Sequence, residues 1–153
     1  MTPPARTLKQ RTQDTLHRLE QDVDVWVSTA APDGAAPHLI PLSYHWDGTT
    51  LLLATPAASP TGRNLRTTGR VRLAFGPTRD VVVVDGTVET LEAAGLPAGA
   101  GDAFAERTGF DPRRLTTAYL YFRVTPRWVQ AWREADEIAG RDLMRDGEWL
   151  VDD

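Results

Sequence analysis

The sequence predicts a mainly β fold of the α+β class, a closed or nearly closed barrel of six or seven mostly antiparallel strands with a few peripheral helices. Its length of 153 residues is that of one domain with a single core. Most apolar runs are short and alternate with polar residues, as in half-buried strands. Turn signals rich in Gly, Asp and Pro separate these runs. We therefore expect one domain over residues 1–153.

The N-terminal segment has a different period and is expected to form an amphipathic helix. Between Arg6 and Gln21, the residues Leu8, Leu16 and Leu19 recur at helix-like spacing. The period then changes to the alternation of strands, with turn signals between successive runs. Three strands of an antiparallel meander are expected at 23–28, 37–46 and 50–54.

The pattern breaks at 55–60, and a short helix is expected from there to Gly69. Two strands follow, at 70–75 and 81–91, and Asp85-Gly86 within the second predicts either a β-bulge or a tight hairpin. The segment 96–117 is expected to be helical or irregular. In it, Asp102 is a candidate cap for a helix that Gly109 ends, and Asp111-Pro112 is a candidate start of another. The last strands are expected at 118–125, at 128–132 and in a hairpin around 146–147.

Composition excludes several classes of function. The net charge of −4 and the pI near 5.3 give no overall positive field for nucleic acid or an acidic membrane surface. The chain has no cysteine, which excludes disulfides, thiol catalysis and cysteine-bound metal clusters. Its three histidines lack metal-ligand spacing, so no metal site is expected. No apolar run is long enough to span a membrane, and the start has no secretory signal, so we expect a cytoplasmic protein.

The start of the short helix is the best candidate for a binding site. Ser59 is a good N-cap and Pro60 suits the first helical position. Free N–H groups and a partial positive charge at a helix start favour a phosphate. Thr61 would add a hydroxyl, Gly62 would permit close approach, and Arg63 would supply a full charge. The alternative is a capped connector helix with a solvated arginine. Arg70 and Arg72 are expected to form a solvated strand edge.

Three short motifs occur in an order and spacing that resemble a known family. They are SPTGRNLRTTGRVRLAFG at 59–76 after a leucine-rich strand ending in Thr-Pro, DGTVE at 85–89, and an RVTP…W arrangement from Arg123 to Trp132. The chain from about 23 to 149 thereby resembles the pyridoxamine 5′-phosphate oxidase-like split β-barrel family. The resemblance implies a split barrel and a homodimer with two flavin sites, each built from both subunits.

The resemblance also implies which residues contact the cofactor. The positions near its phosphate correspond to Thr55, Ser59, Thr61, Arg63 and Asn64. The backbone along its ring system corresponds to Ile40, Pro41 and Leu42, and the partner chain would contribute Trp132 and Arg133. Many relatives carry a lysine in the phosphate helix, whereas this chain has Gly62 near that place. The other tryptophans are expected in the barrel and the dimer interface.

The sequence contains no nucleophile–base–orienter set, which fits an enzyme whose cofactor carries the chemistry. The resemblance implies a flavin-dependent oxidoreductase that transfers hydride to or from a small molecule. FMN is the first expectation and the deazaflavin coenzyme F420 the alternative. A non-catalytic carrier of a flavin or of haem remains open, as does a barrel that serves only as a dimeric interaction domain.

Overall fold

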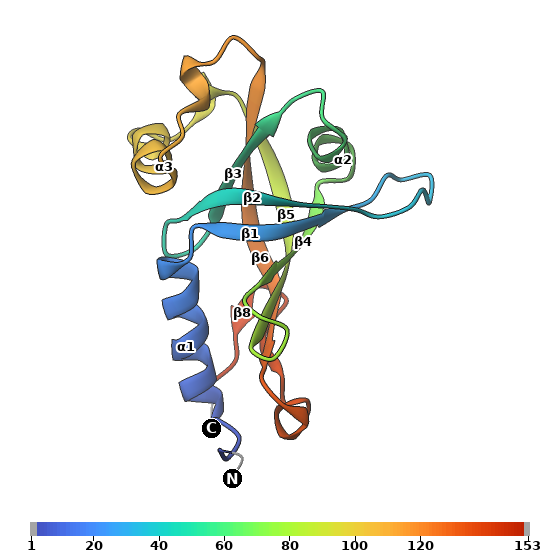
Figure 1. The fold of residues 1–153 in the computed structure, drawn as a ribbon, viewed down its shortest axis with the longest axis vertical. Coiled ribbons are helices and arrows are strands. Elements are labelled where there is room, and N and C mark those ends of the chain that lie inside the picture. The colour runs from blue at the N-terminus through green and yellow to red at the C-terminus, as the bar shows by residue number, and fades with distance from the viewer. Residues whose placement is uncertain (1–2, 152–153) are drawn as a thin grey trace.

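The structure, a computed structural model, describes residues 3–151 as a mainly β protein (Figure 1). The strands are β1 Asp24–Thr29, β2 His38–Trp46, β3 Leu51–Pro56, β4 Arg70–Phe75, β5 Val81–Leu91, β6 Tyr119–Trp132, β7 Asp142–Arg145 and β8 Glu148–Trp149. The α-helices are α1 Leu8–Gln21, α2 Pro60–Thr68 and α3 Ala100–Thr108, and the 3-10 helices are η1 Ala93–Gly95, η2 Pro112–Arg114 and η3 Ala135–Glu137.

Six of the strands close into an antiparallel barrel. They are hydrogen-bonded in the order β3-β2-β1-β4-β5-β6, and a further ladder between β3 and β6 completes the ring. The short strands β7 and β8 continue the sheet beyond β6, joined by the expected hairpin at Asp146-Gly147. Both turn residues have positive φ, as a two-residue hairpin of this type requires. The expected split-barrel fold class is confirmed, with these two strands added to the six of the ring.

The expectation of two separate strands at 118–125 and 128–132 is wrong, because β6 runs unbroken through Pro126. The register of the ladder between β5 and β6 shifts beside Gly86. Gly86 pairs with Pro126, whereas the preceding residue Asp85 pairs with Trp128. Pro126 also lies between the end of the β3 ladder at Val124 and the start of the β7 ladder at Val129. A proline is tolerated at such a bulge because its missing N–H removes no ladder hydrogen bond there.

The same irregularity decides between the two readings of Asp85-Gly86. β5 runs without a break through Asp85-Gly86, so the hairpin alternative is wrong; the chain has a bulge here, whose extra residue is Arg127 of β6, between the partners of Asp85 and Gly86. A Cβ atom at Gly86 would lie 2.6 Å from Val124 Cγ1 and 2.8 Å from the Thr125 carbonyl oxygen. Gly86 therefore permits the close approach of β6 at the bulge.

The helices cover the barrel at different places. In Figure 1, α2 and α3 lie on opposite sides of the upper end, and α1 runs beside the lower part. Ser59 caps α2 and Gly69 ends it in the left-handed conformation, as expected. Asp102 does not cap α3, because Gly99 occupies the N-cap position and Asp102 instead pairs with Arg113 at 2.8 Å. The predicted end of α3 at Gly109 is confirmed.

Two charged residues attach the N-terminal segment to the C-terminal end of β6. The buried Arg11 of α1 donates hydrogen bonds from Nη1 to the carbonyl oxygens of Ala131, Glu137 and Gly140. Arg6 pairs with the buried Glu137 of η3, with Nη2 2.7 Å from Oε1 and Nε 3.0 Å from Oε2. These contacts fix α1 against the lower part of the barrel.

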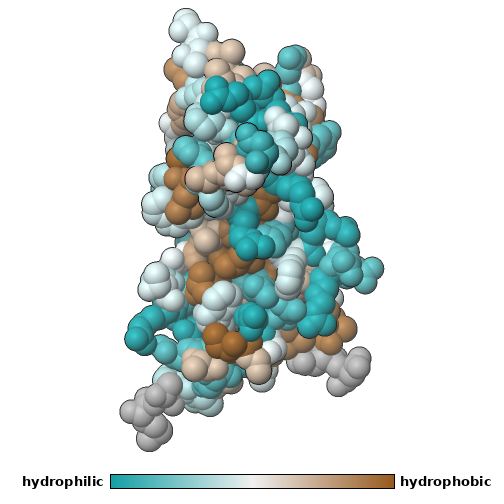
Figure 2. Space-filling view, turned by 90° about the vertical axis from the view of Figure 1, so that its right-hand side faces the viewer, coloured by the Kyte–Doolittle hydropathy of each residue, from teal (hydrophilic) through white to brown (hydrophobic). Residues whose placement is uncertain are grey.

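Apolar side chains form two clusters. The larger fills the barrel and includes Leu53, Leu65, Leu73 and Phe122. The smaller lies outside the barrel wall beneath α3 and includes Leu52, Ala54, Phe104 and Tyr121. On the side seen in Figure 2, apolar surface is exposed at mid-height between hydrophilic regions. Among residues 3–151, no helix combines the length and the apolar character of a membrane span.

Candidate functional site

The predicted phosphate residues Thr55 and Ser59 lie together where β3 leads into α2. Ser59 Oγ accepts a hydrogen bond from the Gly62 N–H at 2.9 Å and donates one to the Pro56 carbonyl oxygen at 2.8 Å. Thr55 Oγ1 lies 3.4 Å from the same Ser59 Oγ. The Ser59 hydroxyl therefore donates its proton to the turn before the helix and is not available to a phosphate. The helix start has one hydroxyl donor fewer than the sequence predicts.

Few backbone donors remain at this helix start. Pro60 has no N–H, the Gly62 N–H bonds Ser59 Oγ, and the Arg63 N–H bonds the Ser59 carbonyl oxygen at 2.9 Å. Among the described residues the Thr61 N–H has no such partner. The Thr61 side chain is fully buried and its Oγ1 also lacks a hydrogen-bond partner in this part of the chain. Thr61 is therefore packed inside this corner, and neither its N–H nor its hydroxyl is exposed to a ligand.

The two remaining predicted side chains of α2 differ in their surroundings. Arg63 is exposed, and within residues 3–151 its guanidinium makes no hydrogen bond or ion pair. Asn64 Nδ2 instead donates to Thr29 Oγ1 of β1 at 3.2 Å. Arg63 is thus free to bind an anion, whereas Asn64 joins the helix to the barrel.

Sequence reasoning missed Arg66, which brings a second guanidinium to the same turn. Its Nη2 lies 2.5 Å from the Ala57 carbonyl oxygen, and its Nε lies 3.4 Å from that of Gly62. Arg66 follows Gly62 by four residues and therefore shares its face of the helix. That spacing is the sequence signal that could have identified it.

Gly62 permits close approach, but the group that approaches belongs to the chain itself. A Cβ atom at this position would lie 2.4 Å from the Pro56 carbonyl oxygen and 3.1 Å from that of Ala57. The first turn of α2 therefore packs directly on the preceding turn. A lysine of the kind that relatives carry near this place would require α2 or this turn to move.

The strand segment Ile40, Pro41 and Leu42 borders the same corner. These residues pair with β1, but the ladder between β2 and β3 contains only Tyr44, His45 and Trp46 on the β2 side. Continuing that register would place Leu42 opposite Thr55, but the β2–β3 ladder ends at Tyr44 and Leu53, while the ladder on the other edge of β3 continues through Thr55 to Pro56. The strands β2 and β3 therefore separate where α2 begins, and this is the split of the barrel.

Trp132 and Arg133 are not brought to this corner within one chain. Trp132 follows Leu120, the partner of Thr55, by twelve residues of β6, about 40 Å of strand. The Arg141 guanidinium lies 5.9 Å from the centre of the Trp132 ring, and Arg133 Nε lies 3.4 Å from Asp80 Oδ1. Both residues belong to the opposite end of the barrel.

A hollow of about 440 Å³ lies beside the C-terminal half of α2. Thr29, the partner of Asn64, lines it together with Arg70 and Arg72. Arg72 pairs with Asp85 at 2.5 Å, so the expected solvated edge is in part an ion-paired wall. The other polar side chains that line this hollow include Ser28, Thr68, Thr87 and Arg127. In the described chain, no group of three or more His, Asp or Glu side chains could hold a metal ion.

Comparisons with known proteins agree with this architecture. A putative pyridoxamine 5′-phosphate oxidase from Listeria innocua superposes with a TM-score of 0.63 at 16% identity, covering 80% of this chain and 98% of that one. An F420 reductase has a TM-score of 0.59 at 20% identity, over 74% of this chain and 93% of that one. A heme binding protein from Mycobacterium smegmatis has a TM-score of 0.70 at 17% identity, over 96% of this chain and 60% of that one.

At these identities the structural likeness shows the fold alone. No curated protein sequence matches the chain. The sequence model of the pyridoxamine 5′-phosphate oxidase family, however, matches residues 12–133, which include β1 to β6 and the whole corner at α2. The split barrel, the capped helix beside the split and this match over most of the sequence lead to one conclusion: the chain belongs to the pyridoxamine 5′-phosphate oxidase family.

Proposed function

We propose that the protein is an oxidoreductase that binds FMN, or alternatively coenzyme F420, and transfers hydride to or from a small molecule. The observation that carries this proposal is the corner where β2 and β3 separate beside the start of α2. The cofactor phosphate would lie at the helix start, and its ring would lie along the free edge of β2 at Ile40, Pro41 and Leu42. The cytoplasmic location is part of the same proposal.

The donors at the corner fit one phosphate group. Within residues 3–151 Arg63 has a free guanidinium, and Arg66 lies at the same turn beside the start of α2. A helix N-terminus and two guanidinium groups favour an anion through both charge and hydrogen bonds. With no lysine and with the Ser59 hydroxyl occupied, we expect cofactor affinity to depend chiefly on Arg63.

A homodimer is part of the proposal, since Trp132 and Arg133 of one chain can reach the α2 corner only in a second copy. Support comes from the outer face of the barrel, where Pro41, Trp26, Ala74 and Val83 are successive cross-strand neighbours. The Trp26 side chain is 49% exposed, and exposed aromatic residues in an apolar row are typical of interfaces. We expect Trp26→Glu to convert a dimer into monomers in analytical ultracentrifugation, and a monomeric parent protein would refute the assembly.

A bound flavin would supply the hydride chemistry, and this chain would supply binding and position. Arg63 and Arg66 would hold the phosphate, which would fix one end of the cofactor. The backbone of β2 from Ile40 to Leu42 would hold the ring, because its ladder with β3 ends at Tyr44. Among the described residues around this corner no side chain is a candidate acid or base, so we assign no catalytic residue.

The test is titration of the cofactor-free protein with FMN and separately with coenzyme F420, followed by absorbance and fluorescence. Arg63→Ala should weaken binding by about 1.5–3 kcal/mol, or roughly 10- to 150-fold, as for a hydrogen bond to a charged group. Arg114→Ala is the matched control, because Arg114 is also exposed but pairs with Asp111 just beyond the end of α3, on the other side of the barrel from α2. If Arg63→Ala binds both cofactors as tightly as the parent protein, the phosphate site is wrong.

A second candidate is a carrier that binds a flavin or haem without turnover. The likeness to the heme binding protein, which covers 96% of this chain, favours this alternative. Haem titration would then give a Soret band with saturable binding. A carrier would bind cofactor but fail to reoxidise a reduced flavin with any small-molecule acceptor, whereas an oxidoreductase would turn over.

A further inference from the structure

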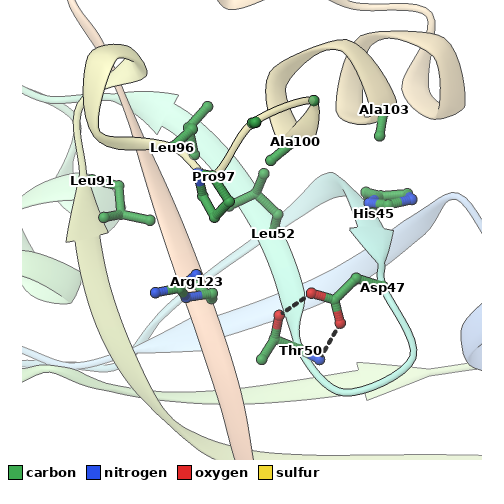
Figure 3. A pocket seen from close by; sticks show the side chains of 12 residues that line it. His45, Asp47, Thr50, Leu52, Leu91, Leu96, Pro97, Ala100, Ala103 and Arg123 are labelled. Atoms are coloured by element: carbon green, nitrogen blue, oxygen red, sulfur yellow. Dashed lines mark hydrogen bonds between the residues drawn. The ribbon is translucent and has the colours of Figure 1, made fainter.

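A cavity of about 280 Å³ lies on the outer face of the barrel, away from the α2 corner (Figure 3). His45 of β2, Leu52 of β3 and Arg123 of β6 are successive cross-strand neighbours, so their side chains share one face of the sheet. The segment from Leu91 to Ala103, which joins β5 to α3, covers this row. No residue of α2 lines the cavity.

The covering segment and the floor of the cavity are apolar. Leu96, Pro97 and Ala100 extend over Leu52 in Figure 3, and Leu91 closes one side. Leu52 is 7% exposed and belongs to the cluster beneath α3. An apolar group placed here would be enclosed on several sides, as in small-molecule pockets, and the volume suits a bicyclic ring or a smaller one.

The polar groups at the rim are unequal in what they offer a ligand. Asp47 Oδ1 accepts hydrogen bonds from the Thr49 and Thr50 N–H groups at 2.8 and 2.7 Å, and Oδ2 accepts from Thr50 Oγ1 at 2.8 Å. Although burial alone would raise the pKa of Asp47, these hydrogen bonds lower it below its usual value. Asp47 is therefore an ionised group whose acceptors are already occupied by its own turn.

Arg123 and His45 retain unused hydrogen-bonding capacity. Arg123 gives one N–H, from Nη2, to Glu89 on β5, and its other donors have no partner in residues 3–151. The Arg123 side chain is 32% exposed and the His45 side chain makes no hydrogen bond to any described residue. A guanidinium with free donors beside an apolar cavity suits a carboxylate joined to an apolar body.

We propose that this cavity binds a small, flat, apolar carboxylic acid in its ionised form. The carboxylate lies on Arg123, and the apolar body lies between Leu52 and the segment of Leu96 and Pro97. The site is separate from the proposed cofactor corner, so it does not depend on flavin binding.

The test uses 2-naphthoate as the probe and isothermal titration calorimetry of the cofactor-free protein. We expect saturable binding with one site per chain. The neutral isostere 2-naphthamide should bind at least about tenfold more weakly, because it lacks the charge that pairs with Arg123. Arg123→Gln should weaken 2-naphthoate binding by a similar factor, whereas the control Arg79→Gln, which lines no described cavity, should leave it unchanged.

Methyl NMR of the parent protein gives a readout that does not depend on any variant. Addition of 2-naphthoate should shift the methyl signals of Leu52, Leu91 and Leu96 and leave that of the exposed Leu39 in place. The proposal is overturned by the absence of saturable binding, by equal affinity for the amide, or by shifts that leave these three leucines out. Cofactor titration is a separate experiment, so failure of either site is recognisable without the other.

Discussion

Glu137 provides a quantitative test of how the N-terminal segment is held to the barrel. Its side chain is 3% exposed and accepts hydrogen bonds from Arg6 N, Nε and Nη2 and from the Arg133 N–H. Pairing with Arg6 lowers the pKa of Glu137 from 4.5 to about 2. A difference of this size corresponds to about 3 kcal/mol of stabilisation of the folded state at neutral pH.

We therefore expect Glu137→Gln to lower the free energy of unfolding by about 3 kcal/mol at pH 7. The loss includes the cost of leaving Arg6, which is 9% exposed, with Asp14 as its remaining carboxylate partner, at 3.1 Å. Glu134→Gln is the matched control, because Glu134 is 45% exposed and pairs with the still more exposed Arg79. Its expected effect is below about 1 kcal/mol.

The pH dependence of unfolding tests independently whether ionised Glu137 stabilises the folded state. Because the pKa of Glu137 is lower in the folded than in the unfolded chain, its stabilisation is complete above pH 4.5 and is lost as the pH falls towards 2. Urea unfolding of the parent protein and of Glu137→Gln should show a gap that narrows over this range, with about 2 kcal/mol of it lost by pH 3. A gap that is below 1 kcal/mol at pH 7, or that stays constant with pH, would refute the reasoning.

Two further predictions concern the start of α2. Gly62→Ala should lower the free energy of unfolding by about 1 kcal/mol, because overlap of the new Cβ with the Pro56 carbonyl oxygen, at 2.4 Å, outweighs the higher helix propensity of alanine. Urea unfolding measures this, and a variant more stable than the parent protein would show that the contact is not close. Ser59→Ala should lose the cap, worth about 1 kcal/mol in thermal unfolding, whereas Ser59→Asp should keep it. The same Ser59→Asp should greatly weaken titrated FMN through repulsion of its phosphate, and unchanged affinity would contradict the proposed site.

The fold could be predicted largely because its signals are local. Alternation of valines and leucines gave the strands of the barrel, and glycines with positive φ, such as Gly69 and Gly109, ended helices as expected. The break predicted between residues 125 and 128 failed because the partner that accommodates Pro126 is Gly86, far away in the sequence. The prediction that Asp102 caps α3 was wrong because Gly99 and Asp102 both lie near the helix start and both are residues found at N-caps.

The candidate site was only partly predictable for the same reason. The Ser59 cap follows a local rule, and the structure confirms it. The burial of Thr61, the use of the Ser59 hydroxyl by Pro56 and the bond from Asn64 to Thr29 depend on tertiary packing. The cavity beneath α3 could not be predicted, because strands and a covering segment from several parts of the chain build it.

The packing of Gly62 on the Pro56 turn also limits how this protein can evolve. Any side chain at position 62 forces the turn to move, so a lysine gained there by a single substitution would be destabilising. Changes in the turn would have to come first, and alone they would bring no benefit in binding. Selection for a tighter phosphate grip would therefore act on Arg63 and Arg66, which leaves the two arginines as the accessible route of adaptation.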